Sequence, residues 1–163
     1  MTAVIETDNL TKLYGDHLAI SNISLEVREG EVFGYLRPNG ASKTTTIRTL
    51  LDFIRPSGGS ASIFGLDTRA NSREIKRRLA YLPGDIMLYE NLTGREALTY
   101  TANLRGGVDW RFVADLADRL ECDLSRKIRS LSRGNKQKVD LITAFMNKPE
   151  LIIMDEPSSG LGP

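Results

Sequence analysis

Two short segments of this 163-residue chain carry residue types that could hold a phosphate and a divalent cation. Arg37 to Thr44 reads RPNGASKT, and Leu151 to Glu156 reads LIIMDE. The first segment nearly fits the Walker A pattern GxxxxGKT, whose backbone N–H groups surround phosphates while a lysine reaches the outer phosphates and a hydroxyl holds magnesium. Lys43 and Thr44 keep those two side chains. The second segment ends in two carboxylates, which suit a magnesium–phosphate centre.

The first segment departs from the Walker A pattern at both framing glycines, where this chain has Arg37 and Ser42. Glycine permits positive φ and lets the backbone approach an oxyanion, and neither replacement offers that freedom. We therefore expect this loop to bind ATP much more weakly than an intact Walker A loop does. The residues expected to contact the nucleotide in this loop are Asn39, Gly40, Ala41, Ser42, Lys43, Thr44 and Thr45.

A strand, a loop and a helix must follow one another to position such a phosphate loop. Val32 to Leu36 (VFGYL) is a short apolar run that predicts the strand, and Thr44 to Phe53 predicts the helix. The apolar side chains at helical spacing in this region are Ile47, Leu50, Leu51 and Ile54. Leu151 to Met154 predicts a buried parallel strand, which would bring Asp155 to the metal and Glu156 to the water.

Other segments predict a β layer and a group of helices. Alternating or short apolar runs predict strands at 4–9, 20–27, 61–64 and 79–82, and a basic helical stretch covers 73–78. Thr93 to Glu96 (TGRE) has capping-box spacing, which predicts a helix that runs through Leu104. Asp109 is the predicted N-cap of a further helix. The side chains of that helix expected to face the core are Trp110, Val113, Ala117 and Leu120.

The composition is typical of a globular protein and argues against some partners. Hydrophobic residues make up 40% of the chain and charged residues 26%, and the net charge of +1 gives no electrostatic reason to expect nucleic-acid binding. Cys122 is the single cysteine, so we expect a reducing cytoplasm rather than a disulfide-forming compartment. No apolar run approaches membrane-spanning length, so we expect no direct membrane insertion, and a role at a membrane would require a partner.

A third motif lies between the two segments that opened this section. Leu131 to Asn135 reads LSRGN and is followed by KQKVDLITAF and then by the LIIMDEP segment. This order resembles the ATP-binding cassette (ABC) family, in which the signature motif LSGGQ precedes a helix and the Walker B strand runs into DEP. The resemblance extends from about Ile5 to Pro163. The segment RPNGASKTTTIRTLLDFIRPSGG resembles the ATP-binding subunit of a two-component bacterial exporter.

The resemblance implies an α/β fold: a P-loop NTPase core with an antiparallel β layer and a helical insertion subdomain. Residues 1–163 would form an incomplete ABC ATPase domain. Within it, residues 1–82 would make the β layer and the P-loop core, and residues 83–135 the helical subdomain with the signature motif. Residues 136–163 would return to the core with Walker B.

The resemblance also implies roles for individual residues in MgATP binding and hydrolysis. Thr44 and Asp155 would hold Mg2+, and Glu156 would be the catalytic residue that polarises the attacking water. Ser132 and the backbone of Gly134 would contact the γ-phosphate of ATP that is bound by the opposite subunit, next to a helix N-terminus.

Further implications concern the adenine base and the partners. Tyr14 would stack on adenine, the alternative being an exposed loop tyrosine. The chain would pair with a second copy or another cassette, and it would act with a transmembrane permease subunit. It would lie in the cytoplasm at the inner face of the cell membrane, without nucleic acid as a partner.

Several positions depart from the family pattern. Gly84 stands where the family often has a glutamine, and Gly162 where it has an aspartate. Asp140 falls in a helix with apolar neighbours and would need a partner, for which Lys136 one turn earlier is the candidate. The chain ends before the family's switch histidine, so we expect the N-terminal part of a domain.

Three functions remain open at this stage. The first is an ATPase subunit of a membrane exporter, which explains the most residues. The second is a degenerate cassette that does not hydrolyse ATP, favoured by Arg37, Ser42 and Gly162. The third is an inert fragment, favoured by the early end of the sequence. We rank the ATPase subunit first because Lys43 and Glu156 are retained together with their neighbours.

Overall fold

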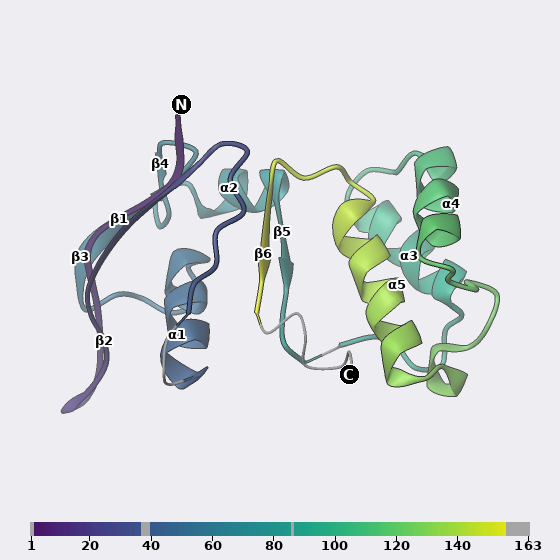
Figure 1. Ribbon diagram of the computed structural model, residues 1–163, viewed down its shortest axis with the longest axis horizontal. Helices are drawn as coiled ribbons and strands as arrows, with labels where there is room; N and C mark the ends of the chain where they lie inside the picture. Colours follow the sequence, from purple (N-terminus) through teal and green to yellow (C-terminus); the bar gives the residue numbers. More distant parts are fainter. Residues whose placement is uncertain (1, 37–39, 86, 156–163) are drawn as a thin grey trace. The chain divides into compact units, whose positions relative to one another are not determined.

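The computed structural model describes residues 2–36, 40–85 and 87–155. These residues belong to two compact units, Met1–Leu79 and Ala80–Pro163 (Figure 1). Within its described part, the first unit holds an antiparallel sheet and two helices. The described part of the second unit holds a two-stranded sheet and a group of helices.

The sheet of the first unit has the strand order β2-β1-β3-β4. Its strands are β1 (Ala3–Tyr14), β2 (His17–Arg28), β3 (Gly58–Ile63) and β4 (Leu66–Asp67). Tyr14 pairs with His17, and the turn between them contains Gly15 at φ +58°, which glycine adopts without strain. Leu10 and Ile63 are completely buried and belong to the core of this unit.

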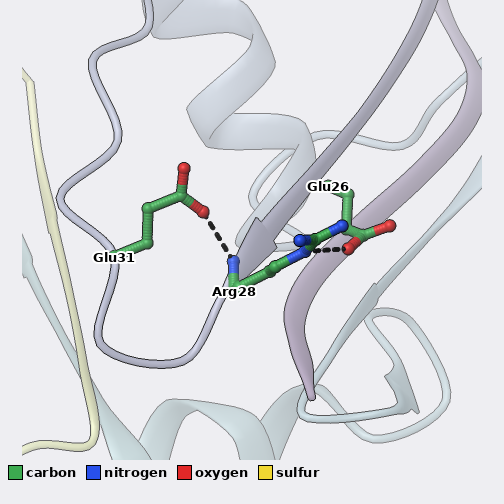
Figure 2. Close-up of polar contacts among 3 residues, drawn as sticks. All are labelled: Glu26, Arg28 and Glu31. Atoms are coloured by element: carbon green, nitrogen blue, oxygen red, sulfur yellow. Dashed lines mark hydrogen bonds and ion pairs between the residues drawn. The ribbon is translucent and has the colours of Figure 1, made fainter. Parts of the chain in front are cut away.

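A small polar network ends β2, and Figure 2 shows its three residues. The Arg28 N–H donates to Glu31 Oε2 at 2.9 Å, and Arg28 Nε donates to Glu26 Oε1 at 2.7 Å. The Glu31 N–H in turn donates to the Arg28 carbonyl at 3.1 Å, which closes a turn directly after the strand. The hydrogen bond and charge of Glu26 raise the pKa of the Arg28 guanidinium.

Two helices complete the first unit: α1 (Gly40–Leu50) and α2 (Ser72–Arg78). α1 packs against β2, and it buries Ile47 and Leu50 as the helical spacing predicted. The threonines at 46 and 49 are also buried, and each hydroxyl donates to the carbonyl four residues earlier at 2.8 Å. These bonds satisfy the polar groups on the buried face of α1. α2 buries Ile75.

The strand predicted for Val32 to Leu36 does not form, because these residues have no assigned secondary structure. Val32 is 100% exposed and Leu36 is 89% exposed. A strand requires a hydrogen-bonded neighbour, and neither sheet in the described part of the chain includes this segment. The Tyr35 hydroxyl lies 3.3 Å from the Thr46 hydroxyl, so the segment contacts α1 instead.

The second unit contains β6 (Leu151–Met154) and all of β5 (Leu79–Leu82) except its first residue, and the two strands form a two-stranded sheet. Its helices are α3 (Gly94–Leu104), α4 (Trp110–Arg119) and α5 (Arg133–Phe145), with a short 3-10 helix η1 (Ile128–Ser130) before α5. One buried cluster joins all three α-helices: Leu98, Ala102, Val113, Ala117, Ile142 and Met146. A second cluster lies under the signature segment: Ala97, Ile128, Leu131 and Val139.

Both helix starts predicted for this unit are confirmed. The Glu96 N–H donates to Thr93 Oγ1 at 3.2 Å and the Thr93 N–H donates to Glu96 Oε2 at 2.7 Å, which is a complete capping box. Asp109 Oδ1 accepts from the Arg111 N–H at 3.0 Å, as expected of an N-cap. The predicted apolar face of α4 is confirmed too, since Trp110 packs against the buried cluster.

Candidate functional site

The N-terminal end of α1 carries the described part of the predicted phosphate loop. α1 begins at Gly40, and its first turn contains no acidic residue. Ser42, Lys43 and the two threonines that follow are partly buried. The first N–H groups of an α-helix point beyond its N-terminus and the helix dipole favours anions there, so this end of α1 together with an ammonium group suits a phosphate chain. Asn39 lies outside the described residues, as does Arg37.

Ser42 is compatible with the backbone that the structure describes. The residue lies inside the first turn of α1, and its carbonyl accepts from the Thr46 hydroxyl at 2.8 Å. Among the described non-glycine residues, positive φ occurs only outside α1. Position 42 is therefore helical in this backbone, and the weaker ATP binding expected from the loss of glycine there stays a prediction. Compared with glycine, Ser42 adds the bulk of a side chain at the N-terminal end of α1.

Tyr14 ends β1, and its side chain is 48% exposed. The Lys12 Nζ lies 4.9 Å from the centroid of the Tyr14 ring. The two residues are separated by one position near the end of β1, where its pairing with β2 is irregular, and their side chains are in contact. A cation next to an exposed aromatic ring is consistent both with a stacking site for a base and with an ordinary surface pair.

Asp155 follows β6 directly and is 6% exposed. Its N–H donates to the Leu82 carbonyl at 2.9 Å, so the carboxylate follows the end of β6 beside the end of β5. Carboxylate and hydroxyl oxygens are the ligands that Mg2+ prefers, which makes Asp155 and Thr44 chemically suitable ligands. Among the described residues, no cluster of three or more His, Cys, Asp or Glu side chains exists that could hold a metal by itself. Glu156 lies outside the described residues.

The signature residues open α5. Ser132 is its N-cap and accepts from the Asn135 N–H at 3.3 Å through its side-chain oxygen. Among the described residues, no atom outside the adjacent residues and the backbone of α5 lies within 4 Å of the position that a Cβ would occupy at Gly134. An exposed hydroxyl, an open glycine and a helix N-terminus therefore lie next to one another, which is an arrangement that an anion can approach.

Beside this end of α5 lies an open pocket of about 430 Å3. Its lining residues are Gly84, Asp85, Leu131, Arg133 and Lys136. The pocket is therefore polar, and it joins the first residues after β5 to the signature segment.

The partner expected for Asp140 was wrong. Lys136 Nζ donates to Glu90 Oε1 at 2.6 Å, and this bond lowers the pKa of Glu90. Asp140 is half-buried, and burial raises its pKa. Sequence reasoning missed Glu90 because it lies 46 residues from Lys136, and such long-range ion pairs leave no periodic signal.

A comparison with known families decides the identity of these motifs. The sequence profile of the family described as ABC transporter matches residues 20–159. The chain belongs to the ABC transporter family. The match includes α1, the signature segment and β6, so the three motifs recognised from the sequence are part of one ABC ATP-binding domain.

Curated ABC relatives cover the whole of this chain. Bacitracin transport ATP-binding protein BcrA of Bacillus licheniformis is 36% identical over 165 residues, which is 100% of this chain and 54% of BcrA. Nod factor export ATP-binding protein I of Cupriavidus metallidurans is 34% identical over 172 residues, covering 100% of this chain and 55% of the relative. The chain thus spans about half the length of the curated relatives it matches.

Solved ABC structures confirm the fold class. The structure described as the ATP binding subunit of an ABC transporter has a TM-score of 0.86 at 33% identity, covering 98% of this chain and 69% of that one. The cbiO1 structure from Clostridium perfringens has a TM-score of 0.83 at 20% identity, a likeness of fold alone. No helix among the described residues combines the length and hydropathy required to cross a bilayer.

Proposed function

We propose that this chain binds MgATP and, when paired with a second ABC cassette, hydrolyses it to drive export through a transmembrane permease. The observation that carries the proposal is the start of α1. This end of the helix has no acidic side chain in its first turn and places Lys43 beside two hydroxyl-bearing residues. Such an end attracts a polyphosphate by its dipole and by charge.

The chain's own residues have separate tasks in this proposal. Lys43 neutralises the outer phosphates, and the first-turn N–H groups of α1 hold their oxygens. Thr44 and Asp155 hold Mg2+, which supplies positive charge against the phosphates when it is bound. Tyr14 covers one face of the adenine.

The second cassette completes the site. Ser132 and Gly134 contact the γ-phosphate of ATP bound across the interface, because a helix N-terminus with an exposed hydroxyl stabilises that charge. Glu156 then polarises the attacking water. Hydrolysis therefore requires a dimer, whereas ATP binding by itself does not.

Export is the direction we propose, and the names of the relatives support it. One relative is named for bacitracin transport and another for Nod factor export. The cargo itself would be selected by the permease. The chain would lie in the cytoplasm against that permease.

A second candidate is a cassette that binds ATP without hydrolysing it. The replacement of the two framing glycines favours this candidate, because a side chain at Ser42 crowds the phosphates. The two candidates differ in turnover and share the nucleotide site.

Titration calorimetry with MgATP tests the shared site. Lys43→Ala should weaken ATP binding by about tenfold or more, since it removes a charge that contacts phosphate. Lys127→Ala removes an exposed lysine from the segment before η1 and is the matched control. An unchanged affinity in Lys43→Ala, or an equal loss in Lys127→Ala, would contradict the proposed site. Phosphate release by the dimer then separates the hydrolysing from the non-hydrolysing candidate.

A further inference from the structure

The outer face of α2 is basic. α2 is seven residues long and buries Ile75, which is 2% exposed. A helix advances about 100° per residue, so Arg73 and Arg77 lie on the side opposite Ile75, with Lys76 at one flank of that side and the exposed Glu74 at the other. Arg69 is exposed in the turn that precedes the helix. We call the four cationic side chains the basic face.

The cations of the basic face form no ion pair within the described part of the chain, although Glu74 lies beside them on α2 and lowers their net charge. The guanidinium groups of Arg69, Arg73 and Arg77 form no ion pair with any described carboxylate. The nearest acid in the preceding turn is Asp67, whose Oδ1 accepts backbone N–H groups from Arg69 at 3.0 Å and from Ala70 at 2.8 Å. Its carboxylate therefore caps the turn and does not pair with the guanidinium groups.

An exposed aromatic ring adjoins the basic face. Lys76 Nζ lies 4.9 Å from the centroid of the Phe53 ring, and Phe53 is 54% exposed. Arg78, at the end of the same helix, lies 3.9 Å from the Phe64 ring centroid. Cations on a helix that has a partly exposed apolar ring at one flank combine the two attractions that hold a peripheral protein at a membrane interface.

We propose that the basic face, together with Phe53, binds the anionic surface of a lipid bilayer. Each unpaired cation near such a surface is attracted by the charged headgroups, and this attraction requires no specific geometry from the partner. The ring of Phe53 can enter the boundary between headgroups and acyl chains. The choice of a bilayer rests in part on the proposed function, which places the chain beside a membrane permease.

The same surface suits nucleic acid less well. Single strands bind in a groove with several stacking platforms, whereas this face offers one ring. The ammonium group of Lys76 lies over that ring and covers one of its stacking faces. A helix of seven residues also provides only a short row of cations.

Co-sedimentation of the whole chain with vesicles tests the proposal without nucleotide. The chain should sediment with vesicles of equal parts phosphatidylglycerol and phosphatidylcholine, and stay in solution with pure phosphatidylcholine. Arg73→Glu combined with Arg77→Glu should lower the partition coefficient by about tenfold or more, because both substitutions reverse a charge near the surface. Both side chains are exposed, and circular dichroism checks that the fold is kept.

The matched control is Arg105→Glu combined with Arg111→Glu. These two arginines are exposed in the second unit, and their reversal changes the net charge by the same amount. The control should keep vesicle binding within about twofold. An equal loss in the control, no binding to anionic vesicles, or release from the vesicles by single-stranded polyuridylate at equal phosphate concentration would each overturn the proposal.

Failure of this inference can be distinguished from failure of the proposed function. Vesicle binding by a chain that does not bind MgATP in calorimetry would contradict the proposed function and support the lipid surface. MgATP binding by a chain that stays in solution with anionic vesicles would overturn the lipid surface alone.

Discussion

Lys136 Nζ lies 2.6 Å from Glu90 Oε1, and this ion pair joins the first turns of α5 to the loop that precedes α3. The Arg129 N–H donates to the Glu90 carbonyl at 2.9 Å, so Glu90 binds the residues on both sides of the signature segment, one by its backbone and one by its side chain. The side chain of Lys136 is only 23% exposed, which holds its ammonium group in one place. The pair therefore connects the residues after β5 to the helix that carries Ser132 and Gly134.

Glu90→Gln should lower the melting temperature at neutral pH and have little effect in acid. The ion pair lowers the pKa of Glu90, so its stabilisation is present above the carboxyl's ordinary pKa and is lost as the pH falls through the lowered value. Thermal melts at pH about 7 and about 2.5 check this, since the second pH lies well below the ordinary pKa of a glutamate. Asp118→Asn, an exposed carboxylate on α4, is the control. A pH-independent difference would show that the charge of Glu90 is not involved.

Asp140→Asn should stabilise the protein at neutral pH. Burial raises the pKa of Asp140, so the folded state favours the protonated form and loses stability as the pH rises through that raised value. Removing the charge should raise the free energy of unfolding by a few tenths to about 1 kcal/mol at pH 7. Asparagine keeps the shape and has a similar helix propensity. The gain in the free energy of unfolding should disappear in acid. A gain that persists there would show that packing, and not the charge of Asp140, is responsible.

Ser42→Gly should strengthen ATP binding by about tenfold while it lowers the melting temperature slightly. The substitution removes the side chain beside the phosphates, but glycine in a helix costs about 0.5–1 kcal/mol relative to alanine. Ser42→Ala keeps the Cβ without the hydroxyl, so it should bind ATP like the parent. Calorimetry and thermal melts measure the two effects separately. Equal ATP affinities for Ser42→Gly and the parent would contradict the idea that the Ser42 side chain crowds the phosphates.

Glu156→Gln should abolish turnover and trap an ATP-bound dimer. The carboxylate is proposed to polarise the attacking water, so its loss should reduce phosphate release by about a hundredfold or more. Size-exclusion chromatography with MgATP should then show a dimer that the parent does not accumulate. If Glu156→Gln releases phosphate as fast as the parent, another residue performs this task.

Gly59→Ala should destabilise the first unit by about 2 kcal/mol or more. Gly59 has φ +74°, and a Cβ there would overlap the backbone of Asp8 and Asn9 in β1. The neighbouring Gly58→Ala is the control, because the nearest atom to its Cβ would be the Thr11 Cβ at 3.9 Å. Urea denaturation gives both values. Similar free energies of unfolding for the two variants would show that β1 and β3 accommodate the added Cβ without loss of stability.

Local signals in the sequence were sufficient to predict the caps and helical faces. Thr93 and Asp109 begin their helices as predicted, because a cap is determined by residues within one turn of it. The buried positions of α4 follow from its period for the same reason. The motif order led to the ABC family, since each motif retains most of its characteristic residues.

Those local signals could not predict contacts between residues far apart in the sequence. Val32 to Leu36 has the apolar character of a strand, but pairing depends on a neighbour that the local sequence does not encode. Lys136 lies one turn from Asp140 yet bonds to Glu90, because the preceding loop returns to the start of α5. The roles of Tyr14 and Lys43 in binding remain predictions that ligand titration can test.

The packing of Trp110 against the helices can be followed by fluorescence. It is the only tryptophan in the chain, and it lies in the second unit against the cluster shared by three helices. The Arg95 guanidinium lies 5.0 Å from its ring centroid, so loss of this packing would expose the indole to water and change its emission. Tryptophan fluorescence therefore reports on the helical unit alone, whereas far-ultraviolet dichroism reports on both. If both signals are recorded during one thermal melt, their midpoints show whether the two units unfold together or separately. No engineered label is needed.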